Sequence, residues 1–218
     1  MKQVQLFFMI ILFSVSAGCM LRSRVSLPKD VAIITREEWG AEKPALPVRK
    51  HFPQRITIHH TAVKQNPDRA IAEKLKALQK FSFERSTMSS GKIKEAWADI
   101  PYHFYVAVDG IIGEGRELQY VGESNTPYDP TGHALIVLEG NFENEEVSEE
   151  QYQSLQKLVI SLAKRYRISS ENISGHKDNA STACPGKKLY ALIPKLKRIV
   201  EENEFSSFNV LKYFLSRF

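Results

Sequence analysis

Two histidines and a cysteine in short polar segments have the residue types of a metal site. The pair His59 and His60 ends a segment of alternating apolar and polar residues, and the segment 175–186 carries His176 and Cys184. Zinc in hydrolytic sites is commonly held by three protein side chains, which leaves a fourth position for water. His176 and Cys184 could supply two ligands and one member of the histidine pair the third. The alternative is that these are unrelated core and surface residues, and spacing alone does not choose between His59 and His60.

The chemistry of such a site would be hydrolysis of a stable bond. An amide is a poor electrophile, and water is a poor nucleophile at neutral pH. A bound zinc ion polarises a carbonyl and lowers the pKa of its water from 15.7 to about 7. Two neutral imidazoles and one thiolate would leave the complex with a net positive charge, which favours this chemistry.

Several segments have the pattern of strands that could position these residues. Residues 55–62 alternate with the period of a strand, so neighbouring side chains, such as the two histidines, should face opposite ways. Residues 133–142 carry a continuous apolar run, typical of a central strand. Residues 102–117 predict a hairpin around the Asp109–Gly110 turn, and 31–34 predict a short strand.

Helices and loops are expected between these strands. Residues 68–84 predict a helix with Asp68 as its N-cap and an apolar face. Ser148 and Gln151 fit a capping box at the start of a second helix, and a last helix is expected to begin near Pro194. Residues 86–92 are expected to form a loop. Strands alternating with helices predict an α/β domain with a largely buried central sheet.

The N-terminal segment differs from the rest of the chain. Residues 1–18 have one lysine, an apolar run and then small residues before Cys19, which resembles a lipoprotein signal peptide. We expect export, lipidation of Cys19, and a tether over 19–30 that anchors the chain to a membrane facing the periplasm. An unmodified secretory signal and a buried N-terminal helix are the alternatives. If Cys19 is lipidated, Cys184 is the remaining thiol of the mature chain.

Composition is that of an ordinary globular protein. The 218 residues are 43% hydrophobic and 25% charged, which predicts one main domain, placed here at 31–200 with a C-terminal extension over 201–218. The formal net charge of +5 suits an anionic partner such as a polymer that carries carboxylates. Because the basic residues are scattered along the chain, we expect no nucleic-acid partner.

A set of motifs, taken in order, resembles one family. The chain is similar to the zinc-dependent N-acetylmuramoyl-L-alanine amidases of the amidase type 2 and peptidoglycan recognition protein superfamily. This resemblance implies a single domain with a central mixed β-sheet flanked by helices, Zn²⁺ as cofactor, and peptidoglycan or muropeptides as partners. The motifs that carry it are "ITREEWGA" (34–41), "ITIHHTA" (56–62), "WADIPYHFYVAVDGIIGEGR" (97–116), "LEGNFE" (138–143) and "GHKDNASTACPG" (175–186).

The resemblance also assigns roles to individual residues. By analogy the first histidine of the pair is the ligand, so the metal ligands would be His59, His176 and Cys184. Tyr102 matches a tyrosine near the zinc in catalytic members, and Thr182 matches an active-site threonine, so both are expected to be catalytic. Two further residues are candidates for substrate binding: Arg116, whose guanidinium suits a stem-peptide carboxylate, and His60, for which support of the ligands is the alternative.

Three departures from the family pattern bear on function. Val137 stands where the recycling amidases have a catalytic glutamate, and we assign Glu139 a structural role. The segment "VGESN" (121–125) replaces the more usual "VGAHA", and the region between Phe83 and Trp97 is a basic, serine-rich insertion. A binding module that holds muropeptides without cutting them and a purely structural zinc site remain alternatives, as does an amidase directed at competing bacteria.

Overall fold

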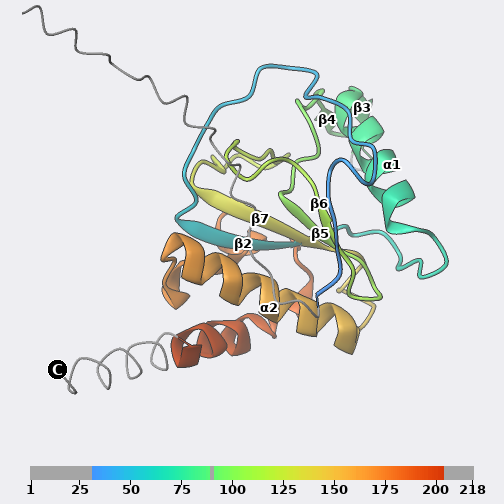
Figure 1. The fold of residues 1–218 in the computed structure, drawn as a ribbon. Helices are drawn as coiled ribbons and strands as arrows, with labels where there is room; N and C mark the ends of the chain where they lie inside the picture. Colours follow the sequence, from blue (N-terminus) through green and yellow to red (C-terminus); the bar gives the residue numbers. More distant parts are fainter. Residues whose placement is uncertain (1–30, 89–90, 204–218) are drawn as a thin grey trace, which may run out of the picture.

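The computed structural model describes residues 31–88 and 91–203 and contains a 6-stranded mixed sheet (Figure 1). The strands occur in the order β1-β6-β5-β7-β2-β8. Strands β2, β5, β7 and β8 are mutually parallel where they pair, and β6 runs antiparallel to β5. The strands of this sheet are β1 (Ile33–Ile34), β2 (Arg55–His60), β5 (Phe104–Val106), β6 (Ile112–Glu114), β7 (His133–Leu138) and β8 (Ile173–Gly175).

The strands follow the sequence pattern closely. The apolar run of β7 is completely buried between β5 and β2, as expected for a central strand. The predicted hairpin is formed by β5 and β6, and Gly110 takes a positive φ of 81° in the turn between them. The prediction of a central mixed sheet in a single α/β domain is therefore confirmed.

Helices cover one face of the sheet. Helix α2 (Glu149–Tyr166) begins at the predicted capping box, in which the Ser148 side chain accepts from the Gln151 N–H. A helix over 193–203 lies beside α2 below the sheet (Figure 1), and it starts one residue before Pro194. Apolar side chains from both helices pack with those of β2 and β7 into the larger core cluster.

The opposite face is only partly covered by helix α1 (Ile71–Phe83). This helix starts three residues after the predicted N-cap: Ala70 occupies the cap position and no side chain caps it. Ile71 and Leu75 are buried, as the predicted apolar face requires. Three polar residues, Lys74, Gln79 and Ser82, are buried as well, whereas the apolar Phe81 is 42% exposed. Polar partners on the neighbouring strands and loops account for this.

The segment expected to be a loop forms part of a small ribbon. Strands β3 (Ser86–Thr87) and β4 (Ile93–Lys94) pair antiparallel beside α1 (Figure 1). Lys94 is fully buried, and its ammonium donates to the carbonyl oxygens of Ser82, Glu84 and Glu95. A buried lysine satisfied by backbone carbonyls fixes the ribbon to the end of α1.

Some sequence predictions fall outside this structure. The signal peptide, Cys19 and the tether lie in residues 1–30, and most of the C-terminal extension lies in 204–218. The helix over 193–203 runs without a break past residue 200, so the predicted domain boundary falls inside a helix. Within the described ranges, no helix has the length and apolar character needed to span a membrane.

Candidate metal centre

Parallel strands bring the two distant histidines together. His59 lies near the carboxyl end of β2, and His176 follows directly after β8. Because β8 pairs with β2 in parallel, with Ile58 opposite Gly175, the segments that follow the two strands leave the sheet at the same edge. The carboxyl edge of parallel strands is where ligand sites form in α/β proteins.

Cys184 is returned to this edge by the loop over 176–186. The Lys177 N–H donates to the Cys184 carbonyl oxygen, which closes the loop. Gly186, with a φ of 86°, lies so close to the chain at Phe142 that a β-carbon there would be 2.5 Å from a backbone carbon atom. The glycine therefore allows the loop to pack against the segment after β7.

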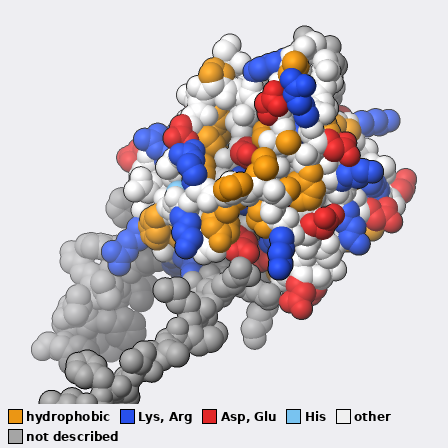
Figure 2. All heavy atoms as spheres, turned by 90° about the horizontal axis from the view of Figure 1, so that it is seen from above, with side chains coloured by type: hydrophobic (Ala, Val, Ile, Leu, Met, Phe, Trp, Pro, Cys, Tyr) orange, Lys and Arg blue, Asp and Glu red, His pale blue; other side chains and the backbone are white. Residues whose placement is uncertain are grey.

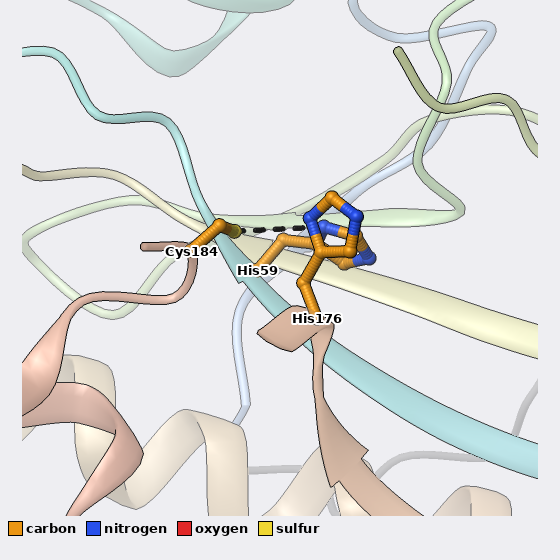
Figure 3. Close-up of side chains that lie close together, drawn as sticks. All are labelled: His59, His176 and Cys184. Carbon is orange, nitrogen blue, oxygen red and sulfur yellow. Dashed lines mark hydrogen bonds between the residues drawn. The ribbon is translucent and has the colours of Figure 1, made fainter. Parts of the chain in front are cut away.

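The three side chains converge at a single point (Figure 3). The ligand atoms of His59, His176 and Cys184 all lie within 4.8 Å of one another. The Cys184 Sγ is 3.7 Å from the His59 Nδ1, and the rings of His59 and His176 have centroids 4.4 Å apart. His59 and Cys184 are 125 positions apart in the sequence, and the predicted ligand set requires that they lie side by side, as they do.

Burial sets the protonation of these groups. It lowers the pKa of His59 well below the usual range, with a smaller contribution from His176, and it lowers the pKa of His176 to about 4. Both imidazoles are therefore neutral at pH 7, as metal ligands must be. Burial also raises the pKa of the Cys184 thiol to about 12, which the His60 N–H partly opposes. A nearby cation would be needed to hold this sulfur as a thiolate at neutral pH.

The donor set fits zinc. Imidazole nitrogen and thiolate sulfur are common zinc ligands, and three protein ligands are typical of a site that retains an open position. His59 Nε2 is buried and has no hydrogen-bond partner among the described residues. Such an imidazole is poorly satisfied by the protein alone, which is consistent with a ligand role.

Tyr102 lies beside this group. Its ring centroid is 5.1 Å from that of His59, and the side chain is partly exposed. Burial of the hydroxyl raises the pKa of Tyr102 further above its ordinary value, with smaller contributions from Cys184 and Tyr128. The phenol is therefore a hydrogen-bond donor at all ordinary pH values and is unsuited to act as a base.

Thr182 contacts the backbone of the cysteine. Its Oγ1 accepts a hydrogen bond from the Cys184 N–H at 3.2 Å, and the side chain is partly exposed. The threonine thus shapes the turn that presents the sulfur. A catalytic role for Thr182 stays a prediction.

His60 faces the opposite side of the sheet from His59, as neighbouring strand residues should. Its ring lies against Phe142, whose N–H donates to the His60 Nδ1 at 3.3 Å, and the side chain is 7% exposed. The His60 backbone N–H points to the Cys184 Sγ at 3.4 Å. His60 therefore supports the cysteine, the alternative named from the sequence, and substrate contact by His60 stays a prediction.

Arg116 also has a different role from the one expected. It is 3% exposed, and its guanidinium donates to the carbonyl oxygens of Ile100, Asp99 and Val121 and to the Glu123 carboxylate. Because the guanidinium is buried and donates its hydrogen bonds within the protein, it is not available to bind a stem-peptide carboxylate. The expected contact with substrate is not formed by Arg116 because residues after the hairpin, Val121 and Glu123, fold back over its side chain.

Val137 and Glu139 occupy the positions anticipated from sequence. Val137 is fully buried and lies opposite His59 in the register of β2 and β7. Glu139 forms a buried ion pair with Lys74 and accepts from the N–H groups of Asn66 and Val108. Glu139 is structural, and the residue at the position of the glutamate of the recycling amidases is the apolar Val137.

Two residues near the site were missed from sequence. The Thr126 Oγ1 lies 2.8 Å from the His176 Nε2, and the Ser124 Oγ lies 3.4 Å from the same nitrogen. The signal that could have found them was the departure of the 121–125 segment from the family pattern, because Ser124 lies in that segment and Thr126 directly follows it.

The surface above the sheet is mixed in character. Seen from above in Figure 2, apolar side chains occupy the middle of the face, with lysine, arginine, aspartate and glutamate side chains spread around them. Basic residues on this face are thus interspersed with acidic ones, in keeping with their scatter along the sequence.

Comparisons with known proteins agree with this fold. The family model described as N-acetylmuramoyl-L-alanine amidase matches residues 49–187. Peptidoglycan-recognition protein SD of Drosophila simulans is 25% identical over 182 residues, which cover 82% of this chain and 92% of that protein. The solved structure of peptidoglycan recognition protein LE in complex with tracheal cytotoxin is 30% identical, with a TM-score of 0.63 and coverage of 75% of this chain and 93% of that one. The endolysin N-acetylmuramoyl-L-alanine amidase LysCS of Clostridium intestinale is also 30% identical, with a TM-score of 0.54 and coverage of 75% and 91%.

Proposed function

The chain belongs to the N-acetylmuramoyl-L-alanine amidase family, and we propose that it is a zinc-dependent hydrolase of peptidoglycan. The bond cleaved is the amide between N-acetylmuramic acid and L-alanine, the bond that the family description names. The observation that carries the proposal is the convergence of His59, His176 and Cys184 within 4.8 Å. This set supplies three zinc ligands and leaves a fourth position open.

A zinc ion bound by these residues would polarise the scissile carbonyl and activate a water molecule. The protein's own contribution begins with His59 and His176, which burial keeps neutral, and with Cys184, whose thiol proton must leave when the metal binds. Tyr102, held protonated beside His59, donates a hydrogen bond to the oxygen on which negative charge develops. Thr182 orients Cys184 through its backbone N–H.

Recognition without cleavage is the second candidate function. It is favoured by the names of the relatives, which include peptidoglycan-recognition protein SD, and by Val137 at the place of the family glutamate. The complete ligand set favours the enzyme, because a module that only binds muropeptides has no need of a cysteine ligand beside the two histidines.

Digestion of purified sacculi separates the two candidates. Zinc-loaded wild-type protein is expected to release stem peptides that begin with a free L-alanine amine, detected by mass spectrometry. Cys184→Ala is expected to release none, and its circular dichroism spectrum verifies that it is folded. Binding of wild-type protein to sacculi without release of peptides would reject the hydrolase and favour the recognition module.

We further propose that the protein is exported and anchored to a membrane through a lipid on Cys19, a proposal that rests on the sequence of residues 1–19 alone. Expression in a bacterial host followed by mass spectrometry of the mature N-terminus tests it. The expected product is an acylated cysteine at position 19, and Cys19→Ser should abolish the acylation. A wild-type chain that retains residues 1–18 would overturn the proposal.

A further inference from the structure

A pair of hydroxyl groups lies against the metal-ligand candidate His176. The Thr126 Oγ1 is 2.8 Å from the His176 Nε2, and the Ser124 Oγ is 2.7 Å from the Thr126 Oγ1. The Thr126 N–H also donates to the Ser124 Oγ at 3.2 Å. These contacts form a short chain of hydrogen bonds that ends on one nitrogen of the imidazole.

We propose that Thr126 is a positioning residue that fixes the tautomer of His176, so that Nδ1 is the nitrogen available to the metal. The inference deepens the proposed function and rests on its metal site. A neutral imidazole carries its proton on one nitrogen and a lone pair on the other, and the hydrogen bond made by one nitrogen selects which. With the Thr126 hydroxyl oxygen accepting from the Nε2–H, the lone pair for a metal ion is on Nδ1.

The hydrogen-bond directions that this tautomer requires are compatible with the donors available. The Ser124 Oγ already accepts from the Thr126 N–H, and it lies within reach of the Thr126 hydroxyl proton. If Thr126 donates its hydroxyl proton to Ser124, the Thr126 Oγ1 presents lone pairs to His176 and accepts from the Nε2–H. This arrangement leaves Nδ1 unprotonated, as a ligand must be.

The orientation of the His176 ring is restricted on two sides by aromatic rings. The His59 ring centroid is 4.4 Å away and the Tyr128 ring centroid is 5.3 Å away. Figure 3 shows the His176 ring over that of His59, with one nitrogen turned toward Cys184. Packing thus limits the tilt of the ring, and the hydroxyl at Nε2 distinguishes its two nitrogens.

The segment that carries both hydroxyls is itself anchored. The Glu123 carboxylate receives the guanidinium of Arg116 and the Ala98 N–H. Two residues on, the Asn125 carbonyl oxygen accepts from the Lys92 ammonium of the inserted ribbon. Arg116 and Lys92 therefore hold the chain on either side of Ser124, which gives the buried arginine and the insertion a role in presenting His176.

A matched pair of variants tests the proposal. Thr126→Val keeps the shape of the side chain and removes the hydroxyl, whereas Thr126→Ser keeps the hydroxyl. Thr131→Val is the control, because it removes a threonine hydroxyl that bonds to Asp129 on the exposed surface. Zinc affinity is measured by competition with a chromophoric chelator, and the absorption spectrum of the Co²⁺-substituted protein reports the ligand geometry.

Loss of a group that orients a ligand typically weakens metal binding about 10–100-fold. We expect this loss and an altered Co²⁺ spectrum for Thr126→Val, with near wild-type values for Thr126→Ser and Thr131→Val. Thermal unfolding of the metal-free proteins should be nearly the same for all four chains, which excludes general destabilisation. Zinc affinity of Thr126→Val within about twofold of wild type, or an equal loss in Thr126→Ser, would overturn the inference. Failure of the wild-type chain itself to bind zinc would overturn both the inference and the proposed function.

Discussion

The Lys74 ammonium lies 2.8 Å from the Glu139 carboxylate, and the two side chains are only 7% and 4% exposed. This ion pair joins α1 to the end of β7, next to the strand that carries His59. Glu139 also accepts from the N–H groups of Asn66 and Val108, so the carboxylate is well satisfied. These contacts indicate a structural role for Glu139. A role in proton transfer would require a carboxylate oxygen that faces the metal-ligand residues and is free to take up a proton.

Removal of one partner of this pair should destabilise the fold. Lys74→Met leaves the Glu139 carboxylate buried without its cation, which typically costs about 3–5 kcal/mol of unfolding free energy. Lys74→Met combined with Glu139→Gln removes both charges and keeps an amide oxygen for the Asn66 N–H. Urea unfolding of the metal-free proteins should show the double variant to be more stable than the single one. Equal stability of the two would contradict the assignment of the pair.

Tyr102→Phe should separate catalysis from metal binding. Loss of one donor to a developing oxyanion typically lowers kcat by about 10²–10³. Because Tyr102 is not among the ligand residues, zinc content should stay at the wild-type level. Release of stem peptides from sacculi measures the first effect and elemental analysis the second. An unchanged rate would remove Tyr102 from the proposed mechanism.

Gly186→Ala should disturb the loop that presents Cys184. The new β-carbon would lie 2.5 Å from a Phe142 backbone carbon and 2.8 Å from the Glu143 nitrogen, at a φ of 86°. Gly91→Ala is the control, because its φ of 77° is similar and nothing lies within 4 Å of the added carbon. The strain of a positive φ is about 1–3 kcal/mol in both variants. Weaker zinc binding is expected for Gly186→Ala alone, and equal binding in both would contradict the close approach as its cause.

Acid should destabilise the folded protein through its buried histidines. Burial lowers the pKa of His103 to about 3 and that of His133 to about 4, each from an ordinary value of 6.5. Well above pH 6.5 both histidines are neutral in the folded and in the unfolded protein. As the pH falls below 6.5 the unfolded chain takes up protons that the folded chain does not, so stability is lost until the folded pKa values are reached. Each such group contributes up to about 1.4 kcal/mol per pH unit.

His103→Asn tests this window. An asparagine can accept from the Leu135 N–H as the His103 Nδ1 does, but it takes up no proton. The slope of unfolding free energy against pH, measured between roughly pH 4 and 6, should be shallower in the variant than in the wild type. An identical slope would show that His103 does not contribute.

Much of the fold follows from local sequence signals. The continuous apolar run of β7, the Asp109–Gly110 turn and the Ser148–Gln151 capping box each specify structure through nearby residues, and each appears as predicted. The start of α1 was predicted wrongly, since Asp68 has the residue type of an N-cap but Ala70 occupies the position. The buried face of α1 depends on partners far away in the sequence: Lys74 is buried because it forms an ion pair with Glu139. The spacing of apolar residues along the helix cannot predict such a pair.

The candidate site was predictable in its ligand residues and less so in what surrounds them. His59, His176 and Cys184 could be chosen from residue type together with family resemblance. Arg116 was expected at the substrate because a guanidinium suits a carboxylate, but its buried position depends on carbonyl oxygens of two other segments, at Asp99 and Ile100 and at Val121. The contact of Thr126 with His176 spans 50 residues and depends on the path of an atypical segment, which only the folded structure gives.

Zinc content of the folded protein tests the central claim most directly. The chain is refolded with zinc, dialysed against a weak chelator and analysed for metal and protein, beside Cys184→Ala and the near neighbour Thr182→Ser. Close to one zinc ion per chain is expected for the wild type and for Thr182→Ser, and almost none for Cys184→Ala, because two imidazoles alone hold the metal too weakly. A folded wild-type chain without stoichiometric zinc, or a Cys184→Ala chain that retains it, would contradict the assignment of His59, His176 and Cys184 as the metal site.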